Sequence, residues 1–337
     1  MKYVFLLPRK INGRIPERIF GCSYSMYPIQ DLACLYAASV LREAGHNVKL
    51  VEFDSSARSI NPPQADGYLV HSVYLTAAYD VALAGRLPGR QLFYFGPLPT
   101  LAPERYLARD GPVVLRGEIE HYLVKAVADP VASVGTTNRL KGRVHHNKSA
   151  GIIKKLDHLP LPARDLDDKR EYYNPKLSYR RSTIVMASRG CANRCYFCVP
   201  NSISWARELE WKKSHRLKPP VTMRSAKSII GEIAAVKRAG YKEFSFIDDQ
   251  FVIGRQRAID IMRGIKKYHL SFGMLARCDR LLDEVLVESM AQAGCRYVDL
   301  GVESFSQKIL DDIRKDLKTS SIYRSIHLLK KYHIEPK

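Results

Sequence analysis

Short apolar runs alternate with amphipathic segments through most of this 337-residue chain, and the alternation restricts the fold to the α/β class. In the first part of the chain, the apolar runs predict strands at residues 3–7, 48–53, 67–70, 91–95 and 112–115. Helices are predicted over about residues 28–44, where Gly45 ends the pattern, and over about 120–128. Alternation of this kind indicates a parallel, doubly wound sheet, which binds ligands beyond the carboxyl ends of its strands.

The alternation weakens over residues 129–181 and then resumes. The segment 157–164 is rich in proline and is expected to be extended, because proline disfavours the helical conformation of the residue before it. Beyond it, strands are predicted at residues 183–187, 243–247, 272–275 and 296–300, and helices at 225–239, 283–293, 306–315 and 319–332. Four β/α units in series indicate a TIM-type barrel or part of one.

The domain organisation predicted from these patterns has three parts. Residues 1–130 form a doubly wound, Rossmann-like domain, residues 131–180 a connector, and residues 181–337 a partial (β/α) barrel. The chain ends at Lys337, where a fifth strand is expected, so the barrel is expected to be incomplete at its C-terminus. An uncovered fourth strand would be an aggregation hazard. We therefore expect either a truncated chain or one that another polypeptide completes.

The N-terminus and the composition indicate a cytoplasmic protein. The apolar run at residues 3–7 meets a proline and charged residues, unlike a signal peptide, and no apolar stretch reaches the roughly 20 residues of a membrane span. The formal net charge is +20, but the basic residues are scattered and show no interleaved aromatic motif. We favour a solvated basic surface, and a nucleic-acid substrate is the minor alternative.

Three of the seven cysteines lie close together in the segment Ser188-Arg189-Gly190-Cys191-Ala192-Asn193-Arg194-Cys195-Tyr196-Phe197-Cys198. The segment follows a predicted strand, so it forms a loop at the carboxyl edge of the sheet, where catalytic groups lie. In a reducing compartment such a cluster indicates metal binding rather than disulfides. Thiolates with this spacing can hold an iron–sulfur cluster and leave one iron free for a small molecule.

A structural zinc site is the main alternative, and it normally has four protein ligands. His215, Cys278 and Cys295 are further candidates, but none of them shows a paired spacing. We expect Cys278 and Cys295 to be core residues instead.

The Cys-x3-Cys-x2-Cys spacing with an aromatic residue before the last cysteine resembles the signature of the radical S-adenosylmethionine (SAM) superfamily. The resemblance implies that Cys191, Cys195 and Cys198 bind a [4Fe-4S] cluster and that Phe197 lies beside the adenine of SAM. It also implies that SAM chelates the open iron and is cleaved to a 5′-deoxyadenosyl radical, which abstracts a hydrogen from a small-molecule or peptide substrate. An electron donor such as flavodoxin or ferredoxin is then an expected partner.

Three downstream segments resemble the ends of later strands in the same group. Phe246-Ile247-Asp248-Asp249-Gln250-Phe251 places two carboxylates where they could accept hydrogen bonds from SAM or substrate; a helix N-cap is the alternative for one of them. Arg277 is expected to pair with the SAM carboxylate. Glu303 or Ser304 is expected to hold the ribose, and an Arg277–Glu303 ion pair is the structural alternative.

The N-terminal part resembles the cobalamin-binding domain of class B radical SAM methyltransferases. The resemblance rests on residues 28–54, on Phe95-Gly96-Pro97-Leu98 and on Arg116-Gly117-Glu118-Ile119-Glu120. It implies cobalamin contacts at Gly96 and Gly117.

Two departures from that pattern bear on the cofactor. Phe95 and Ile119 stand where the family has glycines, so their bulk is expected to crowd the corrin. The motif that supplies a lower axial histidine is absent. His71 and Tyr74 could face the cobalt, although His71 could equally be a hydrogen-bonded core histidine.

Taken together, these features predict a radical SAM enzyme that transfers a methyl group to an unactivated carbon with the help of cobalamin. A first alternative is a radical SAM enzyme whose N-terminal domain no longer binds cobalamin and which performs a rearrangement or cyclisation. A second is a catalytically incomplete accessory protein that binds a cluster or cofactor for a partner.

Overall fold

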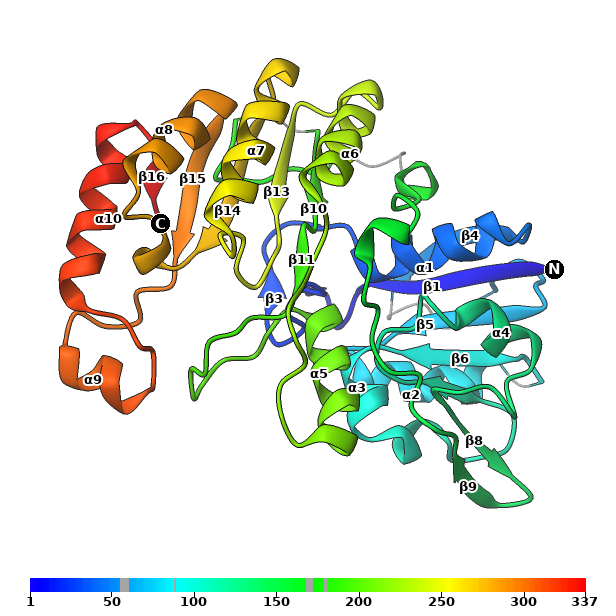
Figure 1. The fold of residues 1–337 in the computed structure, drawn as a ribbon. Coiled ribbons are helices and arrows are strands. Elements are labelled where there is room, and N and C mark those ends of the chain that lie inside the picture. Colours follow the sequence, from blue (N-terminus) through cyan, green and yellow to red (C-terminus); the bar gives the residue numbers. More distant parts are fainter. Residues whose placement is uncertain (55–60, 88, 168–171, 179–180) are drawn as a thin grey trace. The chain divides into compact units, whose positions relative to one another are not determined.

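A computed structural model describes residues 1–54, 61–87, 89–167, 172–178 and 181–337 of the protein. The chain divides into two compact units, which are both visible in Figure 1. Unit 1 contains Met1–Lys154, His158–Arg170 and Asn201–Pro219, and unit 2 contains Lys155–Asp157, Glu171–Pro200 and Pro220–Lys337. The units therefore interleave along the chain, and residues 201–219 belong to unit 1 although they follow the cysteine loop. The predicted boundaries at residues 130 and 180 stay a prediction.

Unit 1 is built around a seven-stranded sheet in the order β4-β1-β5-β6-β7-β8-β9. Its strands are β1 (Lys2–Lys10), β4 (Asn47–Asp54), β5 (Gly67–His71), β6 (Leu92–Phe95), β7 (Val113–Leu115), β8 (Thr136–Leu140) and β9 (Arg143–His146). The strands from β4 to β7 run parallel to their neighbours, as predicted. Their order places the switch in winding direction between β1 and β5, which is where doubly wound sheets bind ligands.

The last two strands of this sheet lie within the segment predicted as a connector. β8 pairs antiparallel with β7, and β9 pairs antiparallel with β8. The sequence of β8, Thr136-Thr137-Asn138-Arg139-Leu140, contains little apolar surface, so the apolar pattern does not predict it. Two short strands, β2 (Ile15–Pro16) and β3 (Tyr24–Ser25), form a separate antiparallel pair.

The helices of unit 1 are α1 (Leu32–Glu43), α2 (Ala77–Arg86), α3 (Pro97–Leu101), α4 (Leu123–Ala128) and α5 (Ser202–His215). α1 begins at Asp31, whose carboxylate accepts a hydrogen bond from the N–H of Cys34, and Gly45 follows its end with a φ of +81°. α5 lies beside α3 (Figure 1). The sequence patterns predict α1 and α4 but not α5.

Unit 2 is built around five strands in the order β10-β13-β14-β15-β16, all parallel. They are β10 (Ser182–Val185), β13 (Glu243–Phe246), β14 (Ser271–Ala276), β15 (Cys295–Leu300) and β16 (Glu335–Pro336). The first four confirm the predicted strands. β16 pairs with β15 at Tyr297↔Glu335 and Val298↔Pro336, so a short fifth strand covers part of the edge that was expected to be open.

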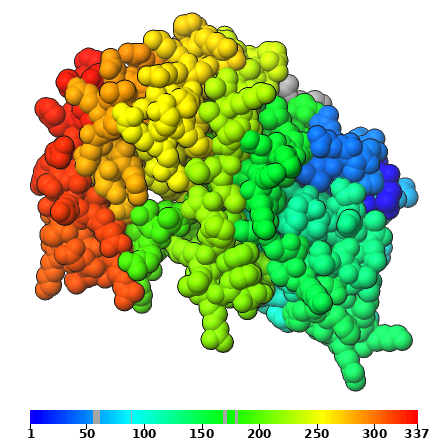
Figure 2. All heavy atoms as spheres, viewed as in Figure 1, coloured from blue at the N-terminus to red at the C-terminus, as the bar shows by residue number. Residues whose placement is uncertain are grey.

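The helices of unit 2 are α6 (Ala226–Arg238), α7 (Arg255–Ile265), α8 (Glu284–Ala293), α9 (Gln307–Asp312) and α10 (Thr319–Lys331). α6 and α7, in yellow-green and yellow, form part of the surface shown in Figure 2. α7 is absent from the predicted helices. Two short strands, β11 (Ser188–Arg189) and β12 (Thr222–Met223), pair antiparallel next to the cysteine loop.

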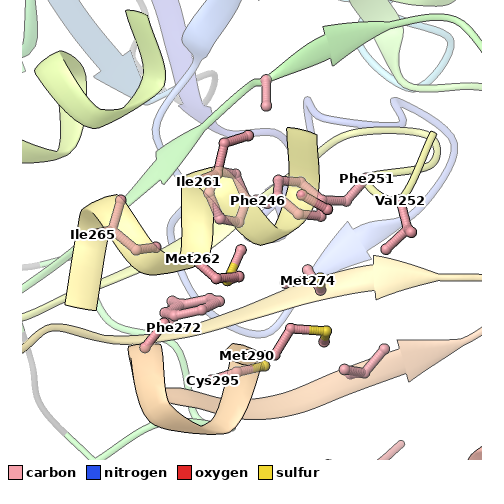
Figure 3. Close-up of a cluster of buried hydrophobic side chains, with 14 of the residues drawn as sticks. Phe246, Phe251, Val252, Ile261, Met262, Ile265, Phe272, Met274, Met290 and Cys295 are labelled. Atoms are coloured by element: carbon pink, nitrogen blue, oxygen red, sulfur yellow. The ribbon is translucent and has the colours of Figure 1, made fainter. Parts of the chain in front are cut away.

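The core of unit 2 contains several phenylalanines packed among aliphatic side chains (Figure 3). The Phe246 and Phe251 rings are 4.4 Å apart, and the Phe244 and Phe272 rings stack at 5.0 Å. The two phenylalanines that flank Asp248 and Asp249 are thus buried anchors, which explains the apolar part of that motif. Among the described residues of both units, no helix has the length and apolarity that a membrane crossing requires.

Candidate functional site

The three clustered cysteines lie on the loop that follows β10 and β11 in unit 2. Cys191 and Cys195 are half-buried and Cys198 is exposed. The amide of Asn193 donates a hydrogen bond to the sulfur of Cys191 at 3.1 Å, and the N–H of Cys198 donates to the carbonyl of Cys195 at 3.4 Å. The loop therefore carries three thiols within eight consecutive residues, and the exposed Cys198 makes it accessible to solvent.

The two motif carboxylates hold the start of this loop. Both oxygens of Asp248 lie 3.1 Å from the N–H of Ala187, and one accepts from the hydroxyl of Ser188 at 2.5 Å. Asp249 accepts from the N–H of Gly190 at 3.2 Å. Neither Asp248 nor Asp249 caps a helix, since the next helix, α7, starts at Arg255 and has Gly254 as its N-cap. The predicted N-cap alternative is therefore wrong for both residues.

Burial also gives Asp248 an unusual acidity. Its side chain is only 1% exposed, and this desolvation raises its pKa to about 6 although Ser188 and Ala187 donate to it. Arg257 of α7 contributes a nearby positive charge and donates to the carbonyl of Ala187 at 2.7 Å. Ala187 is thus held through both its N–H and its carbonyl, three residues before Gly190.

The other side of the loop contacts Arg277, which follows β14, and the segment after α9. Nη1 of Arg277 lies 3.9 Å from the sulfur of Cys195, and Nη2 donates to the carbonyl of Asp316 at 2.9 Å. The N–H of Tyr196 donates to the carbonyl of Ile313 at 3.0 Å. The segment 313–316 is therefore a second support for the cysteine loop.

A buried lysine in that segment connects two of the predicted site residues. The ammonium of Lys315 is 2.9 Å from the carboxylate of Glu303 and 5.6 Å from the centre of the Phe197 ring. Lys315 is 5% exposed, whereas Phe197 is 47% exposed and can accept a neighbour on its free face. No sequence signal singles out Lys315, because nothing in its local pattern differs from that of other surface lysines.

The structural alternative, an ion pair between Arg277 and Glu303, is wrong. Arg277 pairs with Asp279, with Nε 2.9 Å from Oδ1, while Glu303 pairs with Lys315. Glu303 has a φ of +63°, and the hydroxyl of Ser304 accepts a hydrogen bond from the N–H of Ser306 at 3.1 Å. The structure brings Phe197, Arg277 and Glu303 to the carboxyl ends of the parallel strands, together with the cysteine loop.

In unit 1, the carboxyl end of β5 holds a buried polar network. Nδ1 of His71 is 2.7 Å from Oδ2 of Asp31, and the ring stacks on Phe95 with centroids 5.1 Å apart. Burial acts to raise the pKa of Asp31, but the charges of His71 and Arg18 hold that pKa below its ordinary value. His71 is therefore hydrogen-bonded inside the protein, and Tyr74 is 64% exposed.

The ligand crevice, as we name the space at the carboxyl ends of β5, β6 and β7, is filled largely by α5. Arg207 of α5 forms an ion pair with Glu118, with Nε 3.2 Å from Oε2 and both side chains 0% exposed. Glu210 of α5 lies 3.4 Å from Nη2 of Arg116. Since Glu118 and Arg116 come from the loop after β7, α5 occupies the edge of the sheet where a ligand would bind.

The two glycines expected to contact a cofactor are enclosed by protein atoms. Gly117 has a φ of +73°, and a Cβ atom there would lie 3.0 Å from Cβ of Glu210. At Gly96, with a φ of +109°, a Cβ would meet the carbonyl of Ser72 at 2.6 Å. The cavity that remains between His71, Phe95, Ile119 and α5 has a volume of about 20 Å³. This is room for about one water molecule.

The sequence contains a signal for α5 that the apolar pattern does not capture. The side chain of Asn201 accepts a hydrogen bond from the N–H of Ser204 at 3.0 Å, a typical helix start. The residues that α5 buries are largely polar or small, namely Ser202, Ile203, Ser204, Ala206, Arg207 and Glu210. The helix therefore has no apolar stripe, although its N-cap residue can be recognised in the sequence.

Comparisons with known proteins agree with the cysteine loop and the fold. Residues 185–336 match the radical SAM superfamily. The uncharacterized methyltransferase PH0819 of Pyrococcus horikoshii is 28% identical over 324 residues, which are 89% of this chain and 66% of that protein. The chain thus spans slightly less than two thirds of this relative.

Two solved structures share the fold over 99% of the chain. OxsB, a cobalamin-dependent S-adenosylmethionine radical enzyme with aqua-cobalamin bound, superposes with a TM-score of 0.75 at 19% identity, over 48% of its own length. TsrM of Kitasatospora setae, a radical S-adenosylmethionine methyltransferase, does so with a TM-score of 0.70 at 15% identity, over 66% of its length. The predicted resemblance is confirmed for the segment that carries the three cysteines: residues 185–336 match the radical SAM superfamily and form a radical SAM domain.

Proposed function

We propose that the protein is an enzyme that binds a [4Fe-4S] cluster through Cys191, Cys195 and Cys198 and cleaves SAM reductively. The observation that supports the proposal most directly is the cysteine loop itself, in which three partly or fully exposed thiols lie within eight residues at the carboxyl edge of a parallel sheet. Thiolates are the usual ligands of such clusters, so the donor set fits the group. Three donors leave a fourth iron for the amino and carboxylate groups of SAM.

When bound, the cluster and SAM together supply a 5′-deoxyadenosyl radical for hydrogen abstraction from the substrate. In this proposal Asp248 and Asp249 position the cysteine loop through the backbone of Ala187 and Gly190. Phe197 lies beside the adenine, and Arg277 and Lys315 provide positive charge for the SAM carboxylate. Glu303 and Ser304 are proposed to hold the ribose.

Methyl transfer is the proposed reaction class, and it rests on similarity to the methyltransferase of Pyrococcus horikoshii. The expected use of cobalamin receives no such support from the residues of the ligand crevice. Its remaining volume of about 20 Å³ is far below the roughly 300–1,000 Å³ of pockets for drug-sized ligands. The residues therefore do not fit cobalamin. Because methyl transfer to an unactivated carbon was expected to use that cofactor, a rearrangement or cyclisation without cobalamin is the second candidate reaction class.

Cys195→Ala tests the cluster proposal, with Cys22→Ala as the matched control. Cys22 is an exposed thiol in unit 1, so its loss changes the cysteine count without touching the loop. Each variant is reconstituted anaerobically with iron and sulfide, and iron content is measured together with 5′-deoxyadenosine formed from SAM under dithionite. Wild type and Cys22→Ala should hold near four irons per chain and form 5′-deoxyadenosine, and Cys195→Ala should do neither.

Three outcomes would point elsewhere. Full iron in Cys195→Ala refutes the ligand assignment. Near one zinc per chain, with no iron taken up, indicates a structural zinc site. Four irons in wild type without any cleavage of SAM favours the accessory-protein alternative.

A further inference from the structure

We infer that α5 is a permanent occupant of the ligand crevice in unit 1 and that it takes the place which a bound cobalamin would need. The inference concerns unit 1 alone and does not depend on the cluster proposed for unit 2. Doubly wound sheets bind ligands beyond the carboxyl ends of their strands. Here that edge is covered by a helix from a distant part of the same chain.

The centre of α5 is attached by a buried ion pair. Arg207 and Glu118 are both 0% exposed, and Glu118 also accepts a hydrogen bond from the N–H of Ile153 at 2.8 Å. If α5 moved out and the loop after β7 stayed in place, the buried carboxylate of Glu118 would lose its ion pair with Arg207. Breaking a buried pair from one side is strongly destabilising. This contact therefore favours a fixed helix over a movable lid.

The C-terminal half of α5 is attached at two more points. Glu210 faces Arg116 at 3.4 Å, and both side chains are almost fully buried. The ammonium of Lys213 donates a hydrogen bond to the carbonyl of Thr100 at 2.8 Å. The hydroxyl of Thr100 in turn accepts a hydrogen bond from the N–H of Gly117. The loops after β6 and β7, which carry the two glycines, are thus bonded to α5 rather than open to a ligand.

The N-terminal end of α5 is attached to the chain segment after β2. The N–H of Ser202 donates to the carbonyl of Ile19 at 2.5 Å, and its hydroxyl donates to the carbonyl of Arg18 at 2.8 Å. Arg18 in turn donates to the carbonyl of His71 at 2.6 Å. The helix is therefore bonded to the same network that surrounds His71, one of the two residues that could face the cobalt.

The space that remains is too small for any cofactor. A volume of about 20 Å³ holds about one water molecule, and the corrin macrocycle is larger than a drug-sized ligand. Phe95 and Ile119 were expected to crowd the corrin by their bulk. They line the small cavity together with Ser202, Ile203 and Ala206 of α5. Cobalamin could enter only if α5 left.

The test uses the full-length chain and hydroxocobalamin as the probe. The chain is reconstituted anaerobically, incubated with excess hydroxocobalamin and desalted, and iron and cobalt are measured per chain. Amide hydrogen exchange of α5 is followed with and without the probe, and α1 of the same unit serves as the internal reference. We expect near four irons, almost no cobalt, and α5 exchange that matches the slow exchange of α1 under both conditions.

The iron and cobalt readings separate this inference from the proposed function. Absence of iron would refute the proposed iron–sulfur cluster. It would not bear on the inference about α5, which the cobalt content and the hydrogen exchange test. Cobalt near one per chain overturns the inference, whether or not α5 stays protected. Exchange in α5 on the order of 100-fold faster than in α1, without the probe, also overturns it, because the helix would then not be seated.

Discussion

Replacing Arg207 by methionine is expected to lower the unfolding free energy of unit 1 by about 3–5 kcal/mol. Both members of the Arg207–Glu118 pair are 0% exposed, with 3.2 Å between Nε and Oε2. Methionine retains much of the side-chain volume, so a cavity contributes little of the loss. The loss arises because Glu118 would keep its charge where water does not reach. It is a large part of the roughly 5–15 kcal/mol that stabilises a typical domain.

Urea unfolding followed by tryptophan fluorescence measures this loss at the relevant place. The chain has two tryptophans, Trp205 and Trp211, and both lie in α5. Trp205 also packs against the apolar core of unit 1. The fluorescence change therefore reports on release of α5 from the crevice, and the midpoint and slope together yield the free energy.

Arg42→Met is the matched control in the same unit. Arg42 lies 2.8 Å from Asp165, but the two side chains are 43% and 63% exposed, so its loss should cost less than about 1 kcal/mol. The double variant Arg207→Met/Glu118→Gln should recover part of the loss, because it removes both charges of the buried pair. If Arg207→Met costs no more than Arg42→Met, the reasoning about the crevice is refuted.

Three further predictions concern single residues near the two sites. Lys315→Met should leave iron content unchanged and raise the dissociation constant for SAM about tenfold in equilibrium dialysis, because the variant lacks the positive charge that we propose for the SAM carboxylate; an unchanged constant contradicts this. Gly117→Ala should lower the urea-unfolding free energy by about 1–3 kcal/mol, since a φ of +73° strains alanine and its Cβ would lie 3.0 Å from Cβ of Glu210. If the variant is as stable as wild type, the loop adjusts to the added atom and the argument is wrong. Burial raises the pKa of Asp248 to about 6, so the folded state binds the proton more tightly than the unfolded state. The stability from this group, about 3 kcal/mol, is present below about pH 4 and is lost as the pH rises to about 6. The stability of Asp248→Asn relative to wild type should therefore rise over that interval, and a flat difference from pH 4 to pH 7 would rule out the shift.

The cysteine loop and the parallel strands could be predicted because their signals are local. The spacing of Cys191, Cys195 and Cys198 is a property of eight consecutive residues, and buried strands such as β5 and β6 are continuous apolar runs. The strand β8 shows the limit of that signal. Four of its five residues are polar, and pairing with β7 and β9 makes it a strand.

The sequence does not predict which charged side chains pair with one another in the folded chain. Arg277 and Glu303 both follow strands of one sheet, yet each finds another partner, Asp279 and Lys315. The roles of Asp248 and Asp249 are similar cases, because their partners lie about 60 residues away in the chain. A charged side chain has many partners within reach in sequence, and only the folded geometry selects one.

The sequence by itself determined that this chain has an α/β fold, parallel sheets and a loop of three cysteines. The tertiary structure alone decided that α5, which follows the last of those cysteines, packs into unit 1. The physical reason is that α5 is held by buried ion pairs and hydrogen bonds rather than by an apolar stripe. Hydrophobic periodicity predicts which apolar surface is buried, but it does not predict which buried charges form ion pairs.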